Sequence, residues 1–280
     1  CGPLVVKMLA EHTNRTPDRC SWFAPRFPIK PLPIGHASRM TEEWDIANEG
    51  YDASRLAQTF SESSGNFARH ESQVIIIGAG ILGSCTAYFL ARSGIDVVLL
   101  DRGEPNGEAS GNNAGSLHVQ LLAYDFVSDS YNGISPEGQV LPLQQESTRL
   151  WTDLAQEIGR DLEIIICGGL MVAEDEARIR HLEKKVAVER KLGIDVGLIS
   201  GVELRNLAPE VSERMVGASW CPEEGKINPM TAALSVLEAA LTAGARLHKH
   251  TNVLDINKRS GCFEVITSEG LFKAPQIVNA

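Results

Sequence analysis

The chain contains 280 residues, of which 43% are hydrophobic and 22% are charged, and its formal net charge is −10 at pH 7. This is the composition of a folded protein of about two domains, so wholesale disorder is excluded. The acidic balance and the lack of a long basic run disfavour a nucleic-acid partner, and no run of eighteen apolar residues is present to span a membrane.

The six cysteines are scattered along the chain and none forms a CxxC pair. They are Cys1, Cys20, Cys85, Cys167, Cys221 and Cys262. This spacing favours mostly buried thiols in a reducing compartment over a metal site or a disulfide framework. We therefore expect no bound metal and a cytoplasmic location. The chain begins without Met and ends within an apolar run, which we interpret as a fragment or a processed product.

Residues 1–72 differ in character from the rest of the chain. Four prolines between Pro25 and Pro33 predict an extended segment, because proline forbids helix for itself or for its predecessor. Residues 36–72 are polar and Ser-rich, without a sustained apolar period, which predicts a linker. We expect the first domain to begin at Gln73.

From Gln73 the elements alternate between strand and helix. Residues 74–77 form a continuous apolar run that is typical of a buried parallel strand. Residues 81–93 predict a helix closed by Gly94, and residues 97–100 predict the next strand. Strand, helix and strand within about thirty residues form a βαβ unit. Residues 104–135 are rich in loop-forming residues.

The middle of the chain predicts a mixed lobe. An amphipathic helix carries Leu143, Leu150, Trp151, Leu154 and Ile158. A β-hairpin is predicted next, with strands over residues 162–167 and 170–173 and a turn at Gly168-Gly169. A charged surface helix over residues 174–192 follows. A capping box at residues 200–203 then opens a short helix that stops before Pro209, and a strand is predicted near residues 215–221.

The remaining segment returns to alternating elements. Asn228 is expected to cap a helix that has Pro229 at its first position and Gly244 after its end. Short strands are predicted over residues 246–248, 253–256, 263–267 and 276–279. The predicted class is therefore α/β: a Rossmann-like nucleotide-binding domain made of residues 73–135 and 223–280, with an inserted α+β substrate lobe over residues 136–222.

One motif carries chemistry: Gly78-Ala79-Gly80-Ile81-Leu82-Gly83 follows a predicted strand and opens a predicted helix. Gly78 allows a tight turn, Gly80 lets the backbone approach a pyrophosphate, and Gly83 lets the helix pack on the strand. Asp101 ends the next strand, 23 residues after Gly78, where it can accept hydrogen bonds from a ribose. The motif predicts a dinucleotide and leaves FAD and NAD open. The small residues of the loop 108–118 favour a flavin.

The sequence also resembles a known family. VIIIGAGILGSCTAYFLARSGIDVVLLDRG, followed by EASGNNAGSLHVQLL, is similar to the amino-terminal flavin domain of the D-amino-acid oxidase, glycine oxidase and sarcosine oxidase superfamily. SGNNAGSLHVQLL most resembles the beta subunits of opine oxidase and hydrogen cyanide synthase. The resemblance extends from about residue 73 to residue 280, through CGGLMVAED, GKINP, TNVLDI and IVNA.

This resemblance implies FAD and the oxidation of a carbon–nitrogen bond. It assigns Gly78, Gly80, Ile81, Leu82 and Gly83 to the pyrophosphate, Asp101 and Arg102 to the adenosine, Ala109, Ser110, Asn113, Ala114, Gly115, Ser116 and Leu117 to the pyrophosphate and flavin, and Val253 to the adenine. Family members continue beyond IVNA, so the C-terminal part of the family fold and the residues that bind the substrate are expected to lie outside this chain.

Residues 1–35 resemble a different polypeptide, the carboxy-terminal end of the alpha subunit of the same kind of complex. Cys1 stands at the position of the last ligand of a [2Fe–2S] cluster there, but the other ligands are absent from this chain, so no cluster is expected. The juxtaposition suggests a fused alpha–beta product. It implies an alpha-type redox subunit as partner, and peripheral association with the inner face of a bacterial membrane.

The sequence leaves three functions open. The first is an FAD-dependent oxidoreductase that takes hydride from an amino acid or an opine-type secondary amine and passes the electrons to a partner subunit. The second is an FAD-dependent 2-hydroxyacid dehydrogenase of the same fold, because fold does not fix substrate. The third is a catalytically inactive FAD-binding fragment. His118, which follows the flavin loop, is the candidate catalytic residue, with a structural role as its alternative.

Overall fold

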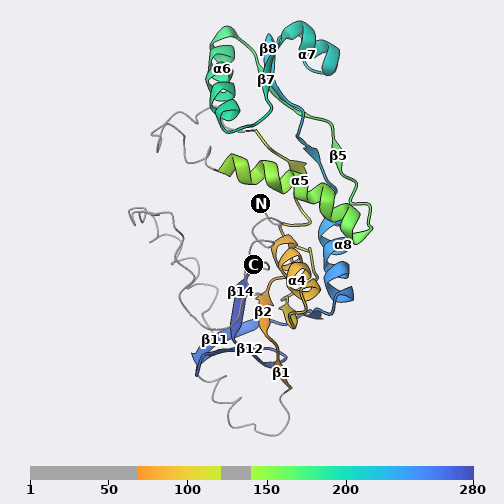
Figure 1. Cartoon of the computed structure of the whole chain (residues 1–280), viewed down its shortest axis with the longest axis vertical. Helices are drawn as coiled ribbons and strands as arrows, with labels where there is room; N and C mark the ends of the chain where they lie inside the picture. The colour runs from red at the N-terminus through yellow and green to blue at the C-terminus, as the bar shows by residue number, and fades with distance from the viewer. Residues whose placement is uncertain (1–67, 121–139) are drawn as a thin grey trace, which may run out of the picture.

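The computed structural model describes residues 68–120 and 140–280. The tail 1–35 and most of the predicted linker lie outside these residues. The described chain comprises a nucleotide-binding half, which contains the predicted βαβ unit, and a smaller lobe, with one long helix, α5 (Leu141–Ile158), between them (Figure 1). None of the described helices is both long and apolar enough to cross a bilayer.

A four-stranded parallel sheet forms the centre of the nucleotide-binding half. Its order is β10 (Arg246–His248), β3 (Val97–Leu100), β2 (Val74–Ile77) and β14 (Gln276–Asn279). β3 is buried along its whole length and β2 along nearly all of it, as continuous apolar strands covered on both faces should be. The predicted βαβ unit is thus confirmed.

A second sheet covers one face of the first. Its order is β1 (Arg69–Glu71), β13 (Gly270–Ala274), β12 (Cys262–Thr267) and β11 (Val253–Arg259). Val265, Phe272 and Ala274 pack between the sheets against Ile75 and Val98. β1 lies within the stretch predicted as linker, and β13 was not predicted. Both owe their pairing to a neighbouring strand rather than to an apolar run of their own.

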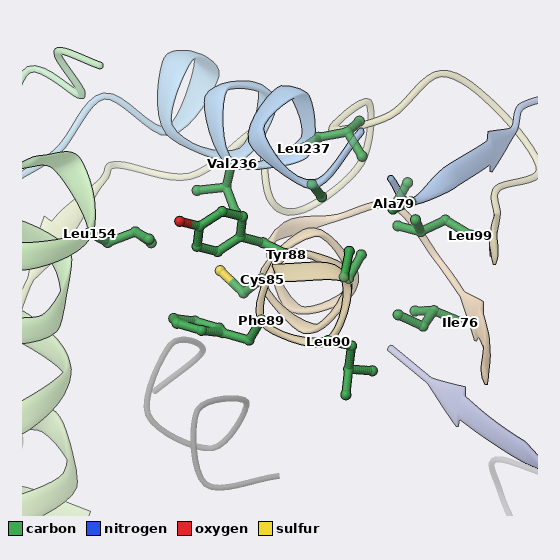
Figure 2. Packing of buried hydrophobic residues seen from close by; sticks show 14 of the residues in the cluster. Ile76, Ala79, Cys85, Tyr88, Phe89, Leu90, Leu99, Leu154, Val236 and Leu237 are labelled. Carbon is green, nitrogen blue, oxygen red and sulfur yellow. The ribbon is translucent and has the colours of Figure 1, made fainter. Parts of the chain in front are cut away.

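Two helices cover the opposite face of the parallel sheet: α4 (Ile81–Arg92) and α8 (Pro229–Thr242). Figure 2 shows Cys85, Tyr88 and Phe89 of α4 reaching toward Val236 of α8 and Leu154 of α5. The predicted ends of α8 are confirmed: the Asn228 side chain accepts a hydrogen bond from the Met230 N–H, and Gly244 follows the helix with φ +105°.

We expect this core to lose stability at alkaline pH. Burial raises the pKa of the Cys85 thiol from 9.0 to about 12. The folded state therefore keeps the Cys85 proton at pH values where the unfolded chain releases it. The free energy of unfolding is unaffected by the ionisation of this thiol below pH 9 and decreases as the pH rises from 9 toward 12. Between pH 8 and pH 10, Cys85→Ala should reduce the loss of unfolding free energy by about 1–2 kcal/mol.

Urea unfolding at a series of pH values measures this difference. Cys167→Ala is the matched control, because the Cys167 thiol is exposed. It should leave the pH dependence as in the parent chain. Equal pH dependence in the Cys85→Ala and Cys167→Ala variants would contradict the assignment to the buried thiol.

The smaller lobe contains two further sheets. One is ordered β4 (Ser116–Leu117), β9 (Gly225–Lys226), β5 (Ile165–Ile166); the other is β6 (Gly169–Ala173), β8 (Gly217–Cys221), β7 (Gly197–Ser200). The helices of this lobe are α6 (Glu176–Lys191) and α7 (Gly201–Leu207). The capping box of Ser200 and Glu203 forms as predicted.

The predicted β-hairpin over residues 162–173 is wrong. β5 pairs with β9, whereas β6 pairs with β8, so the two segments belong to different sheets. Gly168 has φ +78° and lies against the Trp220 ring, where a Cβ would overlap the ring atoms. The two glycines therefore allow close packing of Trp220 and Glu224 instead of a tight hairpin turn.

The charged surface helix forms as α6, but one of its faces is not at the surface. Lys185 and Glu189 are completely buried, and the Lys185 Nζ lies 2.9 Å from the Glu189 carboxylate. Burial lowers the pKa of the Lys185 ammonium, and the Glu189 carboxylate opposes that shift. This helix therefore brings a buried ion pair into the lobe.

Candidate functional site

The turn between β2 and α4 is built from its glycines. Gly78 has φ +101°, and its N–H donates to the Leu100 carbonyl oxygen on the neighbouring strand. A Cβ on Gly83 would overlap the carbonyl oxygen of Gly78. The turn can be this tight only because both positions lack side chains, as the motif predicts.

The backbone N–H groups in the first turn of α4 have no hydrogen-bond acceptor within the helix itself. Gly80 is the N-cap and provides no capping side chain. The Ser110 hydroxyl accepts the Ile81 N–H at 3.0 Å, and a Cβ on Gly80 would lie 2.8 Å from that hydroxyl. The positive end of the helix dipole adds to these donors, so the arrangement suits a phosphate group.

Asp101 lies at the end of β3, beside this turn. Its Oδ2 accepts the Ala79 N–H at 2.7 Å and its Oδ1 accepts the Gly103 N–H at 2.8 Å. Each carboxylate oxygen can accept a further hydrogen bond, so the fixed carboxylate can also receive a ribose hydroxyl. The Thr251 N–H donates to the Asp101 carbonyl, which brings the segment leading to Val253 next to this end of the site.

Arg102 turns away from this arrangement toward solvent. Its guanidinium lies 3.2 Å from Glu108, and both side chains are largely exposed.

The loop that follows folds back on itself. The Asn113 side chain donates to the carbonyl oxygens of Ala109 and Ser110 and accepts the Gly115 N–H at 2.8 Å. Gly115 has φ +67° and packs against the Ile227 carbonyl, where a Cβ would overlap the oxygen. These bonds hold Ser110 at the start of α4.

Beyond Asn113 the chain reaches β4. Ala114 and Ser116 are exposed, whereas Leu117 is buried. Ser116 and Leu117 pair with Lys226 and Gly225 of β9. The residues predicted for the pyrophosphate and flavin thus form one continuous path from α4 to β4.

A cavity of about 220 Å³ opens just beyond β4. It is lined by Ser116, His118, Gln120, Gly168, Gly169, Leu170, Met171, Glu224 and Gly225. The His118 side chain is 39% exposed, and its Nδ1 lies 3.8 Å from the Glu224 Oε1. His118 is therefore available to a molecule in the cavity. Among the described residues, no group of three or more His, Cys, Asp or Glu side chains is placed to hold a metal ion.

Sequence reasoning missed the polar residues behind this cavity. Glu224 and Gln120 are almost completely buried, and Gln120 links Glu224 to Lys185 by hydrogen bonds. Glu224 stands in a Pro-Glu-Glu-Gly run that is typical of an exposed turn, and Lys185 and Glu189 have the spacing of a surface pair. The sequence contains no local signal that would have identified them.

The residues of the turn fit a dinucleotide. The evidence is the glycine turn without room for side chains, the first turn of α4, whose N-cap Gly80 has no capping side chain, and the carboxylate at the end of the adjacent strand. FAD would find donors for its pyrophosphate at α4 and an acceptor for its ribose at Asp101.

Comparison with known proteins agrees with this geometry. Residues 73–280 match the family described as "DAO: FAD dependent oxidoreductase". A glycine oxidase of Geobacillus kaustophilus (strain HTA426) is 27% identical over 216 residues, which are 75% of this chain and 54% of that protein. A mitochondrial sarcosine dehydrogenase of Mus musculus is 26% identical over 74% of this chain and 22% of that protein.

A crystal structure of glycine oxidase from Geobacillus kaustophilus superposes with a TM-score of 0.67 at 27% identity, covering 75% of this chain and 55% of that one. The α/β fold is thus that of an FAD-binding oxidoreductase. The chain spans about half the length of the glycine oxidase it matches, and less of the sarcosine dehydrogenase.

Proposed function

The chain belongs to the DAO family of FAD dependent oxidoreductases, and from this premise we propose that the whole protein oxidises the carbon–nitrogen bond of an amino acid or an opine-type secondary amine. The observation that carries the proposal is the turn at Gly78–Gly83 with the Asp101 carboxylate beside it. The similarity to glycine oxidase and sarcosine dehydrogenase, whose names both denote small amino acids, supports the choice of substrate.

The residues of the site are proposed to bind different parts of the cofactor. The N–H groups of Leu82 and Gly83 would bind the pyrophosphate, and Asp101 would accept from the ribose. Ile81, whose own N–H donates to the Ser110 hydroxyl, would line the pyrophosphate beside them. The other residues proposed for the cofactor are Gly78, Gly80, Arg102, Ala109, Ser110, Asn113, Ala114, Gly115, Ser116, Leu117 and Val253.

When bound, FAD supplies the acceptor for the hydride that leaves the substrate carbon. The chain's own residues would orient the substrate, exclude water and place dipoles near developing charge. His118 is the proposed catalytic residue, because its partly exposed imidazole reaches the cavity and can donate or accept a proton there.

The finer parts of the function rest on the resemblance in sequence. We propose an alpha-type redox subunit as the electron acceptor, as in the opine oxidase and hydrogen cyanide synthase complexes that SGNNAGSLHVQLL resembles. We also propose a cytoplasmic location with peripheral association at the inner face of a bacterial membrane. Copurification of a tagged chain with such a subunit from its own cells would test the partner.

Anaerobic reduction of the bound flavin tests the reaction class. The FAD-loaded chain is mixed in turn with glycine, sarcosine, D-amino acids, opines and 2-hydroxy acids, and bleaching of the flavin absorbance is followed. Bleaching by an amine substrate is the expected result. Bleaching by 2-hydroxy acids alone would replace the proposal with a hydroxyacid dehydrogenase, and retained FAD that no substrate bleaches would indicate an inactive FAD-binding chain.

A further inference from the structure

We propose that Glu224 is a positioning residue, which fixes the backbone of residues 118–120 and so sets the place of His118 on the wall of the cavity. The positioning is a property of the chain itself. Its consequence for turnover rests on the proposed function. The two can therefore fail separately.

The Glu224 carboxylate is bound by the backbone that follows His118. Its Oε1 accepts the N–H groups of Val119 and Gln120 at 2.7 and 2.8 Å. Its Oε2 accepts the Gln120 Nε2–H at 2.9 Å. Three donors from two consecutive residues thus meet at one buried carboxylate, which fixes the chain immediately after His118.

Glu224 itself is held on two sides. The Gly168 N–H donates to its carbonyl oxygen at 2.8 Å, and the next residue, Gly225, pairs with Leu117 of β4. Gly169 lies so close that a Cβ there would overlap the Oε2 atom. The carboxylate therefore has little freedom to adopt another rotamer, and its position is transmitted to residues 118–120.

The direction of these hydrogen bonds is determined by Lys185. The Gln120 Oε1 accepts from the Lys185 Nζ at 2.8 Å and from the Ser219 hydroxyl at 2.9 Å. The Gln120 NH₂ group must then face Glu224, which has to be an acceptor. In Glu224→Gln, the new amide cannot both accept from the backbone and avoid placing its NH₂ group against that of Gln120.

This requirement provides a rescue. In the double variant Glu224→Gln with Gln120→Glu, the carboxylate moves to residue 120, where Lys185 and Ser219 can donate to it. The amide at residue 224 then donates to residue 120 and still accepts the backbone N–H groups. One bond is not restored, because the Gly169 carbonyl oxygen accepts the Gln120 Nε2–H at 3.1 Å in the parent and an ionised glutamate at residue 120 has no donor for it.

The matched control is Glu223→Gln. Glu223 is the adjacent residue of the same type and charge, but its carboxylate accepts from Gln145 and Arg149, away from the cavity. It reports on the loss of one negative charge at this point of the chain without a change in the contacts of residues 118–120.

The experiment combines three readouts on the parent, Glu224→Gln, the double variant and Glu223→Gln. The first is the ¹⁵N–¹H spectrum of ¹⁵N-histidine-labelled chain, with His118→Gln assigning the His118 signal. The second is the Kd for FAD from the quenching of flavin fluorescence. The third is the rate at which an active substrate bleaches the flavin.

Glu224→Gln should shift the His118 signal, change the Kd for FAD by no more than about threefold, and slow bleaching about 10–100-fold. The double variant should return the signal toward its parent position and recover part of the rate, and Glu223→Gln should match the parent. If a folded Glu224→Gln chain keeps the parent His118 signal, or a folded double variant leaves that signal as far shifted as Glu224→Gln does, the proposal is overturned. Loss of bleaching by every substrate in the parent would refute the proposed function alone, because the His118 signal still decides the positioning.

Discussion

Replacement of Lys185 by methionine should lower the free energy of unfolding by about 3–5 kcal/mol. Lys185 is completely buried, and its Nζ donates to Gln120 and Glu189 at 2.8 and 2.9 Å. Methionine fills similar space but removes the ammonium of this network, so the carboxylates of Glu189 and Glu224 lose a buried positive charge that balances them. Urea unfolding at neutral pH measures the change.

Two further variants make this result specific. Lys184→Met changes the adjacent, exposed lysine of the same helix and should alter the unfolding free energy by less than about 0.5 kcal/mol. Lys185→Met combined with Glu189→Leu removes both charges of the pair and should recover part of the loss, because Glu189 no longer leaves an unpaired buried charge, whereas Glu224 and Gln120 still lack the Lys185 ammonium. A loss in Lys185→Met no larger than in Lys184→Met would show that the buried pair does not stabilise the lobe.

Gly83→Ala should weaken FAD binding about 10–100-fold and destabilise the nucleotide-binding half by about 1–3 kcal/mol. The added Cβ would overlap the Gly78 carbonyl oxygen and approach the Ile76 side chain to 3.4 Å. Because the obstacle is backbone, the turn and the start of α4 must move apart, and the donors of the first helical turn then leave their places. Fluorescence titration with FAD measures the affinity.

Gly103→Ala is the control for this variant. Gly103 lies two residues after Asp101, and the nearest atom to a Cβ there is the Asp101 Oδ1 at 4.0 Å. Its N–H can still donate to Asp101 after the substitution. Gly103→Ala should therefore keep the parent affinity. Equal affinity in the parent and the Gly83→Ala chain would mean that FAD does not depend on this turn.

The nucleotide-binding half could be predicted from sequence because its signals are local. The runs at residues 74–77 and 97–100 are apolar throughout, and Asn228, Pro229 and Gly244 specify the ends of α8 by capping chemistry. The glycine motif and Asp101 are also recognisable from local sequence. Their spacing in sequence is also the spacing that brings them together at one edge of the sheet.

The cavity could not be predicted in this way, because its residues meet only through long-range pairing. Gly168-Gly169 has the composition of a hairpin turn, and only the position of Trp220 and Glu224 shows why the glycines are needed there. Lys185 and Glu189 have the same i, i+4 spacing whether a helix face is exposed or buried. His118 was predicted as catalytic from its place after the flavin loop, and its role stays a prediction.

The most direct test of the account is the visible absorption spectrum of the chain after incubation with FAD and removal of free cofactor by gel filtration. The account predicts flavin bands that elute with the protein at about one FAD per chain, and a Gly83→Ala chain that elutes with little flavin. A folded parent chain that elutes without flavin would contradict the claim that the turn at Gly78–Gly83, with Asp101 beside it, is a binding site for FAD.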